Sequence, residues 1–284
     1  MAEVAFAIPG DLATPTGGYR YARELLARLP GHGIVPLHLQ LPGSFPLASV
    51  GDLSLTQALL QATPPDAVLL IDGLAYGAMT DLVLRSVNRT IVALVHHPLA
   101  LETGLPERRR RAFAASERDA LARATAVVAT SAATARVLAA DYGVPTDRLS
   151  VAEPGTASAP ASVGSGGPGV ALLAVGAVSP RKGYGTLLDA LATLSDLPWR
   201  LTIAGATDRA PEEADRLRAA VAAHGLGDRV VLAGAVDDAR LQALYAGADV
   251  FVHPALFEGY GMVLGEAMAL TSSSFFAIGI LLIS

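Results

Sequence analysis

Short apolar runs alternate with longer segments of helical periodicity along most of the chain, and this alternation constrains the fold more than any other feature. In the first half the apolar runs predict strands at Val4–Ile8, Ile34–Leu39, Ala67–Ile71, Thr90–Val95, Ala126–Ala129 and Leu149–Val151. Between them, apolar residues at helical spacing predict helices at Tyr19–Leu29, Leu53–Gln61, Ala75–Val87, Pro106–Arg123 and Ala132–Tyr142. Strand–helix alternation builds parallel βαβ units, so we predict a doubly wound α/β sheet.

The alternation stops at residues 155–169, where GTASAPASVGSGGPG contains almost only small residues. Such stretches are typical of flexible connections. A second alternation then predicts strands at Ala171–Val175, Arg200–Ile203, Val230–Leu232 and Val250–Val252. The intervening helices are predicted at Gly185–Leu194, Pro211–His224, Asp237–Ala246 and Gly261–Ala269. We therefore expect a Rossmann-like domain over 1–155, a linker over 156–169 and a second Rossmann-like domain over 170–284, with the site in the cleft between them.

Composition excludes several classes of protein. The 284 residues are 52% hydrophobic, which argues against a disordered or fibrous chain. The net charge of -5 argues against a nucleic-acid partner, and the absence of cysteine rules out disulfides and Cys-ligated metals. The N-terminus lacks a basic leader region, and no apolar run reaches the ~18 residues of a membrane-spanning helix. We therefore expect a cytoplasmic protein.

Lysine occurs only once in this chain. Lys and Arg together number 21, and Lys182 is the single lysine. It lies in VGAVSPRKG, residues 175–183, directly after a predicted strand. Two adjacent cations at this place, Arg181 and Lys182, suit a diphosphate, because arginine engages two oxygens at once and lysine acts as a point charge. The alternative is a solvated pair of loop cations.

A second motif, HPALFEGYG at residues 253–261, joins a predicted strand to a predicted helix. Two glycines let backbone N–H groups approach a ligand closely, and a helix N-terminus suits phosphate. Glu258 in the loop and Glu266 in the helix can reach different hydroxyls of one extended ligand. The spacing alone equally allows a βα turn with one exposed and one helical glutamate.

Two motifs of the first half also follow strands. PTGGYR, residues 15–20, places Gly17 and Gly18 after the first strand, although ordinary βα turns contain such pairs. His96 and His97 end a later strand, and adjacent residues of a strand point to opposite sides, so at most one faces the cleft. A metal site lacks a supporting acid or third histidine, and a structural histidine is the remaining alternative.

The segment FEGYGMVLGE, residues 257–266, resembles the Glu-x7-Glu motif of family 4 retaining glycosyltransferases, which have the GT-B fold of two Rossmann-like domains. The resemblance implies that Glu258 contacts hydroxyls of the donor sugar and that Glu266 holds the nucleotide ribose. The pocket for the sugar and the phosphates would be lined by Gly259, Tyr260 and Gly261.

The loop before Gly183 is similar to the diphosphate-binding segment of the same family, which ends in Lys-Gly. Lys182 would therefore bind the diphosphate. Many members have arginine where this chain has Ala177, so Arg181 would supply the second charge from another point of the loop.

Three further segments are similar to donor-binding segments of the family. Gly17 and Gly18 resemble the loop that faces the donor phosphates. His97, preferred over His96, matches the histidine near the reacting sugar. In AGAV, residues 233–236, the resemblance places Gly234 and Val236 against the nucleobase.

The resemblance implies transfer of a sugar from a nucleotide-diphosphate donor to an acceptor hydroxyl, with retention and without a metal or a bound cofactor. His97, Lys182 and Glu258 are the predicted catalytic residues, and a glycan or lipid-linked acceptor is expected. A non-catalytic nucleotide-sugar binder is the main alternative. An NAD-dependent oxidoreductase would need G-x-G-x-x-G in the first βα turn, which has only Gly-Gly, and an epimerase of the same architecture would not explain the glutamate spacing.

Two segments carry weaker expectations. The arginine run 108–111 is either a solvated helix face or a patch for anionic lipid head groups at the cytoplasmic face of a membrane. The final residues 271–284, TSSSFFAIGILLIS, do not resemble the family's continuation, so a truncated second domain with weak or absent activity is expected. Phe275–Ile283 is predicted to form a buried strand beside Val250–Val252.

Overall fold

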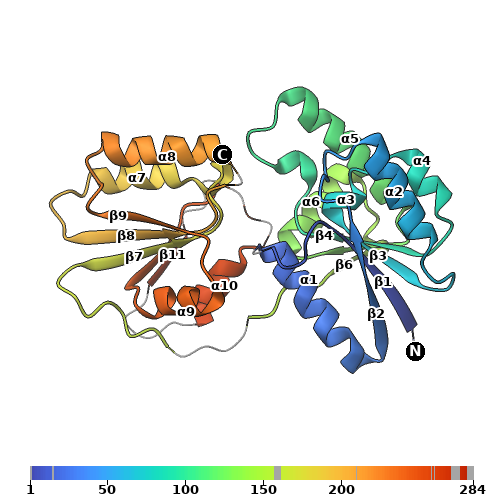
Figure 1. Cartoon of the computed structure of the whole chain (residues 1–284), viewed down its shortest axis with the longest axis horizontal. Helices are drawn as coiled ribbons and strands as arrows, with labels where there is room; N and C mark the ends of the chain where they lie inside the picture. Colours follow the sequence, from blue (N-terminus) through green and yellow to red (C-terminus); the bar gives the residue numbers. More distant parts are fainter. Residues whose placement is uncertain are drawn as a thin grey trace. The chain divides into compact units, whose positions relative to one another are not determined.

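A computed structural model describes residues 2–14, 16–156, 161–208, 210–256, 258, 260–269 and 276–279. The chain divides into two compact units, residues 1–154 and 155–284 (Figure 1). Each unit is a parallel sheet with helices packed on both faces, as the strand–helix alternation predicts.

The first unit holds a six-stranded sheet in the order β2-β1-β3-β4-β5-β6. Its strands are β1 (Ala2–Pro9), β2 (Ile34–Leu41), β3 (Val68–Asp72), β4 (Ile91–Val95), β5 (Ala126–Ala129) and β6 (Leu149–Val151). Its helices are α1 (Gly17–Arg28), α2 (Val50–Gln61), α3 (Gly73–Tyr76), α4 (Asp81–Ser86), α5 (Glu107–Arg123) and α6 (Ala132–Tyr142). The strand order reverses between β1 and β3, which is where open parallel sheets bind ligands.

The second unit holds a five-stranded parallel sheet in the order β11-β10-β7-β8-β9. Its strands are β7 (Val170–Val175), β8 (Trp199–Ala204), β9 (Val230–Gly234), β10 (Val250–His253) and β11 (Phe276–Gly279). Its helices are α7 (Tyr184–Ala192), α8 (Pro211–Ala223), α9 (Asp238–Ala246) and α10 (Met262–Ala269). Counted from β7, this is the strand order of a dinucleotide-binding sheet, and it reverses between β7 and β10.

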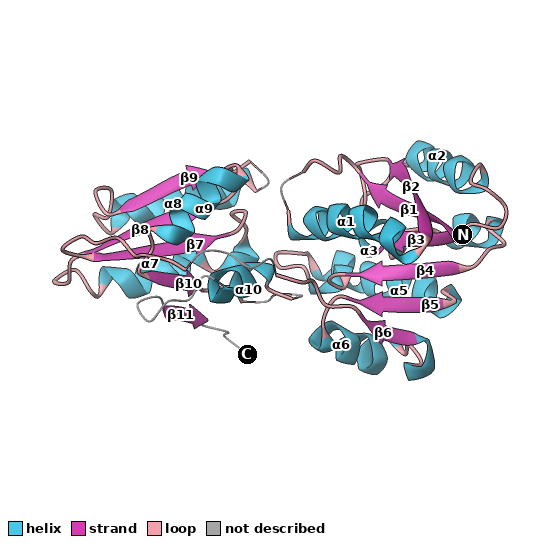
Figure 2. Cartoon of the chain, turned by 90° about the horizontal axis from the view of Figure 1, so that it is seen from below, coloured by secondary structure: helices cyan, strands magenta, loops and turns pink. Residues whose placement is uncertain are grey.

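Side chains of the central strands alternate between two cores in each unit, because successive residues of a strand face opposite sides. In the first unit, Phe6 and Ile8 of β1 pack with α1, and Ala5 and Ala7 pack in the larger core that includes α5. In the second unit, Ala174 of β7 packs with α7 and α8, whereas its neighbours pack with α9 and α10. The four helices that cover this sheet are labelled in Figure 2.

The predicted strand in the final segment is present where the structure describes it. Phe276–Gly279 pairs in parallel with β10, with Val250 opposite Phe276 and His253 opposite Gly279. The other residues of the predicted strand lie outside the described part of the chain.

The single helix predicted at Ala75–Val87 is wrong. The segment forms two short helices, α3 and α4, separated at Gly77–Thr80. Gly77 lies against the side chain of Glu117, where a β-carbon would be 3.0 Å from Cγ. This contact with α5 comes from a residue 40 positions away, so the local periodicity does not contain it.

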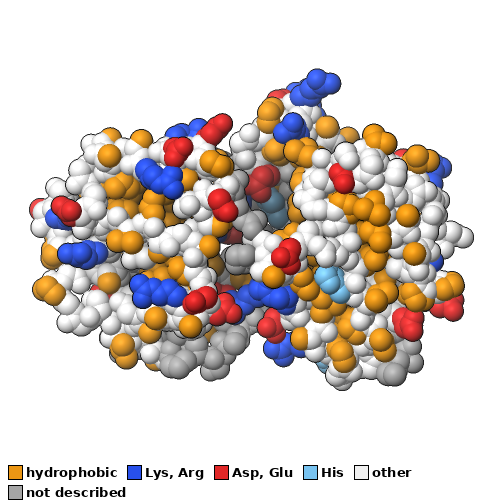
Figure 3. Space-filling model, viewed as in Figure 1, with side chains coloured by type: hydrophobic (Ala, Val, Ile, Leu, Met, Phe, Trp, Pro, Cys, Tyr) orange, Lys and Arg blue, Asp and Glu red, His pale blue; other side chains and the backbone are white. Residues whose placement is uncertain are grey.

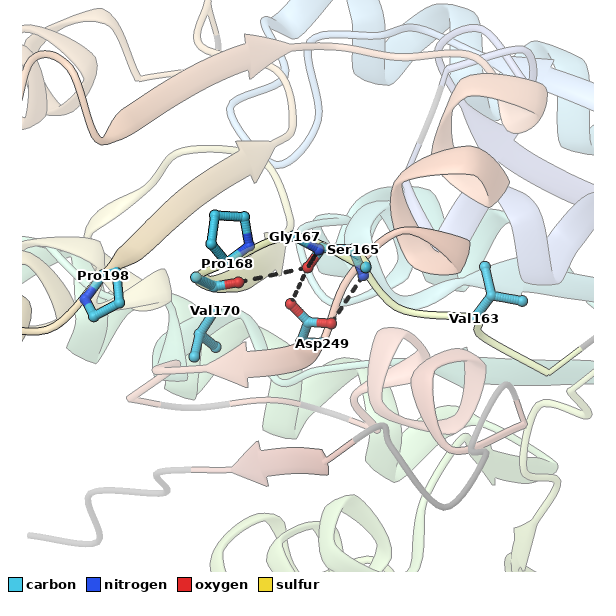
Figure 4. A pocket seen from close by; sticks show the side chains of 9 residues that line it. Val163, Ser165, Gly167, Pro168, Val170, Pro198 and Asp249 are labelled. Atoms are coloured by element: carbon cyan, nitrogen blue, oxygen red, sulfur yellow. Dashed lines mark hydrogen bonds between the residues drawn. The ribbon is translucent and has the colours of Figure 1, made fainter.

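The predicted flexible linker differs from the observed structure over its described part. The Ser162 hydroxyl donates to the carbonyls of Ala246 and Ala248 at 2.9 and 3.1 Å. Asp249, just before β10, accepts from the Ser165 N–H at 2.8 Å and from the Ser165 hydroxyl at 2.6 Å. Ser165 and Asp249 also line a shallow pocket of about 480 Å³ at the N-terminal ends of β7 and β10 (Figure 4). This segment is therefore fastened to the second unit, at the opposite end of its sheet from the strand C-termini.

Glu117 is a buried acid on α5 with 1% of its surface exposed. Its Oε2 accepts the Leu99 N–H at 2.9 Å, and the Tyr142 hydroxyl hydrogen-bonds to the same side chain. Burial raises its pKa from 4.5 to about 7, although both hydrogen bonds favour the ionised form. The carboxyl thus joins α5 and α6 to the segment that follows His96 and His97.

This raised pKa predicts that stability falls as pH rises. Between pH 4.5 and about 7 the unfolded chain ionises Glu117 while the folded chain keeps it protonated. The free energy of unfolding should therefore fall by about 3 kcal/mol relative to a Glu117→Gln variant across this interval. Urea titrations of both proteins at pH 4.5, 6 and 7.5 measure the difference. Parallel profiles for the two proteins would show that Glu117 stays ionised in the fold.

Candidate active site

Two loops meet at the switch point of the second sheet. The loop after β7 carries Arg181 and Lys182, and the loop after β10 carries Glu258. Because β7 and β10 are neighbours in the sheet, their C-terminal ends bring these loops together. The structure therefore joins two motifs that lie 76 residues apart in the sequence.

The loop after β7 is held by a close backbone contact. Pro180–Lys182 forms a 3-10 turn that ends at Gly183, whose φ is 64°. A β-carbon on Gly183 would collide with the Pro254 carbonyl oxygen, so this position admits no side chain. The Leu256 N–H donates to the Arg181 carbonyl at 2.8 Å. The absence of a side chain at Gly183 thus lets the loop after β7 pack closely against the loop after β10.

The Lys182 side chain points back toward the C-terminal end of β7. Its side chain is 9% exposed and lies over Gly176, where a β-carbon would be 2.7 Å from Nζ. The Lys182 ammonium donates to Glu258 Oε1 in a short, charge-assisted hydrogen bond. Arg181 Nη1 lies 3.0 Å from the other carboxylate oxygen, Oε2. One carboxylate therefore engages both cations.

His253 is a third partner that the sequence analysis missed. It is the last residue of β10, is 3% exposed, and places Nε2 at 3.4 Å from Glu258 Oε1. Its ring stacks on Phe251 with centroids 6.2 Å apart. A histidine at the end of a buried strand, five residues before the glutamate, was the available signal.

The charges of this cluster depend on one another. Burial raises the pKa of Glu258, but the nearby His253 ring and the charges of Lys182 and Arg181 outweigh it and hold that pKa well below the usual range. Burial lowers the pKa of Lys182, and the Glu258 carboxylate opposes this shift. The buried ammonium thus depends on a nearby anion to stay charged.

Tyr184 supports the same loop from α7. Its hydroxyl donates to the Gly176 carbonyl at 2.9 Å, and burial raises its pKa above the ordinary value. The residue is buried, so this hydroxyl fixes the end of β7 beneath Lys182. It is a second contributor that the sequence pattern did not reveal.

Glu266 lies in a different environment on α10. Its Oε2 is 3.2 Å from the Tyr245 hydroxyl of α9, which is a neutral partner. Gly261 precedes α10 with φ of 78°, and Tyr260 is partly exposed beside it. The predicted site residue Gly259 lies outside the described residues. Glu258 thus engages cations whereas Glu266 contacts a tyrosine hydroxyl, and the separate roles of the two glutamates stay predictions.

The predicted nucleobase residues follow β9. Gly234 ends this strand with φ of 69° and open space around its α-carbon. Val236 packs against the core on the α9 and α10 face. Their contact with a base stays a prediction.

In the first unit, the structure brings His96 rather than His97 to the Gly-Gly motif. Gly17 and Gly18 form the first turn of α1, and a β-carbon on Gly18 would lie 3.6 Å from the His96 ring. His96 Nε2 is 3.5 Å from Asp72 Oδ2 at the end of β3. His97 Nε2 instead lies 3.9 Å from Glu102 Oε2. The geometry favours His96 as the companion of this motif, and the assignment to His97 stays a prediction.

Among the described residues, no group of three or more His, Asp or Glu side chains could hold a metal ion. Nor does any helix in the described part of the chain have the length and apolarity needed to cross a membrane.

Two family models match this chain. Residues 11–157 match the model of Glycosyltransferase Family 4, and residues 156–271 match the model of Glycosyl transferases group 1. Two Rossmann-like units, each built on a parallel sheet, are the fold of a GT-B glycosyltransferase. The first match alone spans more than half of the sequence, and the chain belongs to glycosyltransferase family 4.

Curated relatives match part of the chain. It is 32% identical to the D-inositol 3-phosphate glycosyltransferase of Acidothermus cellulolyticus over 195 residues, which is 63% of this chain and 43% of that protein. It is 31% identical to the mannosylfructose-phosphate synthase of Agrobacterium fabrum over 160 residues, which is 50% of this chain and 35% of that protein. The matched part of the chain thus spans less than half the length of these relatives.

Solved structures share the fold over nearly the whole chain. Sucrose-phosphate synthase of Thermosynechococcus elongatus superposes with a TM-score of 0.79 at 20% identity, covering 98% of this chain and 81% of that one. The complex of Anabaena HepE with UDP and glucose gives 0.72 at 18% identity, covering 95% and 79%. These likenesses confirm the predicted GT-B fold class.

Gly183 offers a direct test of how the two loops fit together. Gly183→Ala is expected to lower the free energy of unfolding by at least about 2 kcal/mol, since a left-handed backbone costs about 1–2 kcal/mol and the Pro254 contact adds to it. Gly185→Ala is the matched control, because Gly185 lies in α7 with open space around it and should gain about 0.5–1 kcal/mol. Urea unfolding of both variants measures the contrast. Equal stability of the two variants would contradict the proposed contact.

Proposed function

We propose that this protein transfers a sugar from a nucleotide-diphosphate donor to an acceptor hydroxyl. The observation that carries the proposal is the buried cluster of Lys182, Arg181 and Glu258 at the switch point of the second sheet. A pair of cations held in place before substrate arrives is what a diphosphate leaving group requires. The family membership supports the same reaction class.

The barrier to this reaction lies in charge separation. Negative charge builds on the leaving diphosphate while the anomeric carbon becomes cationic. Fixed donors aimed at the developing charge lower the barrier without reorganising, and such donors usually contribute more to the rate than any other feature of a site. In our proposal Lys182 and Arg181 supply that charge, and the N-terminus of α10 at Gly261 adds its unsatisfied N–H groups.

The glutamates position the donor in this proposal. Glu258 accepts hydrogen bonds from hydroxyls of the sugar, and Glu266 accepts from the ribose. Gly17, Gly18 and a histidine of the first unit contribute as the family resemblance implies. Transfer with retention and without a metal ion also follows from that resemblance, and no residue is assigned as a covalent nucleophile.

The proposal is more specific for the donor than for the acceptor. The Anabaena structure holds UDP and glucose, so UDP-glucose is the first donor to test. The names of the two curated relatives describe different products. A glycan or lipid-linked hydroxyl therefore stays the predicted acceptor.

The membrane contact rests on the arginine run at the start of α5. Arg110 and Arg111 both pair with Glu107, which offsets part of the local charge. On the face drawn in Figure 3, charged side chains of both signs are scattered among neutral ones. This supports the interpretation of the run as a solvated helix face, and binding to anionic lipid stays the second alternative.

Donor binding is testable by thermal shift. UDP-glucose, GDP-mannose and ADP-glucose are each added to the protein, and one is expected to raise Tm, because a ligand at 100 times its Kd stabilises the fold by about 2.7 kcal/mol. Lys182→Met should abolish most of this shift, whereas Arg218→Met removes an exposed cation of α8 and should preserve it. Failure of all three donors to shift the wild-type protein would contradict the proposal.

Transfer is tested with the donor that binds. Release of the nucleoside diphosphate is followed with and without candidate acceptors, and Lys182→Met is expected to reduce the rate about 10²–10³-fold, as loss of a transition-state charge partner does elsewhere. The Arg218→Met protein serves again as the control. Donor binding without any turnover would instead favour the non-catalytic nucleotide-sugar binder.

A further inference from the structure

Glu258 engages both cations of the site. Its Oε1 accepts from Lys182 Nζ, and its Oε2 lies 3.0 Å from Arg181 Nη1. The carboxylate side chain is only 16% exposed, so water screens these contacts weakly. The same two cations are the groups that would bind a diphosphate under the proposed function, on which this inference rests.

We propose that Glu258 is an internal counter-ion that the donor displaces and that returns to expel the nucleoside diphosphate product. The carboxylate and the phosphates compete for Lys182 and Arg181. A bound diphosphate must therefore push Glu258 from its partners or remain beside a negative charge.

The sugar decides the outcome of this competition. Sugar hydroxyls donate hydrogen bonds, and a hydrogen bond to a carboxylate is about twice as strong as one between neutral groups. With an intact donor, Glu258 exchanges its cations for hydroxyls, and the phosphates take the cations. After transfer the sugar leaves with the acceptor, and the carboxylate loses its hydroxyl partners and competes again for the cations that hold the product.

The surroundings of Glu258 fit this exchange. Among the described residues, the other groups that face it are His253, at 3.4 Å from Oε1, and Tyr184, whose pKa is raised partly by the Glu258 charge. Two cations against one carboxylate leave one net positive charge from these three residues. The cluster therefore attracts an anion. While Glu258 stays in place, however, a free phosphate meets a net charge of one and not the two positive charges of Lys182 and Arg181.

The consequence is selectivity for donor over product. A site with cations alone would hold a nucleoside diphosphate about as well as the sugar nucleotide, and slow product release limits turnover in many enzymes. A competing carboxylate weakens the binding of product and of inorganic anions specifically. Glu258 would thus contribute to discrimination as well as to positioning of the sugar.

Calorimetry on the full chain tests this assignment with Glu258→Gln. The probes are inorganic pyrophosphate, the sugar nucleotide that raises Tm, and the matching UDP, GDP or ADP. Titrations run at pH 6, because the variant leaves the buried Lys182 ammonium without its counter-ion and lower pH keeps it protonated. The Kd of the nucleoside diphosphate and of pyrophosphate is expected to fall at least about tenfold, since removing one of two adjacent like charges removes their repulsion. The preference for sugar nucleotide over nucleoside diphosphate should fall by at least the same factor, because the variant also loses the charge-assisted hydrogen bonds to the sugar hydroxyls.

Asp215→Asn is the matched control, since it makes the same change in net charge at an exposed pair on α8. It should leave all three dissociation constants unchanged, and melting curves confirm that both variants are folded. Nucleoside diphosphate that binds Glu258→Gln no more tightly than wild type overturns the counter-ion role while the proposed transferase stands. An absence of binding by every probe to both proteins overturns the proposed function and this inference together.

Discussion

The ion pair between Lys182 and Glu258 is the interaction on which the site depends. It joins the loops that follow β7 and β10, the two strands between which the order of the sheet reverses. A buried ammonium and a buried carboxylate are each costly, and their mutual attraction offsets part of that cost. The glycine at 183, the Tyr184 hydroxyl and the His253 ring all serve to keep this pair in one geometry.

The architecture followed from the sequence because its determinants are local. Apolar runs of strand length between amphipathic helices specify parallel sheets regardless of distant contacts, and the strands of both units lie where this pattern predicts them. The break between α3 and α4 was not predictable, because Gly77 meets Glu117 only once α5 has packed. The hydrogen bonds of Ser162 and Ser165 to the second unit were not predicted, because the small residues around them are typical of a flexible linker.

The site was predicted as a set of residues but not as a set of contacts. From the sequence motifs we expected Lys182 to bind the phosphates and Glu258 to bind the sugar, and we predicted no contact between the two side chains. The fold places the two side chains in direct contact, which depends on strand order and on the close approach at Pro254. The signal at His253 was weak, since a histidine closing an apolar strand has many structural uses.

The burial of Lys182 has a consequence for chemical labelling. Because the chain has a single lysine, amine-directed reagents meet one side-chain target, and that target is 9% exposed and held by a carboxylate. Acylation of this amine requires the deprotonated form, so its rate reports how often the contact with Glu258 opens. The amine of Lys182 is thus a side-chain reporter of ligand occupancy within the cluster that the ligand would engage, to be read apart from labelling of the α-amino group.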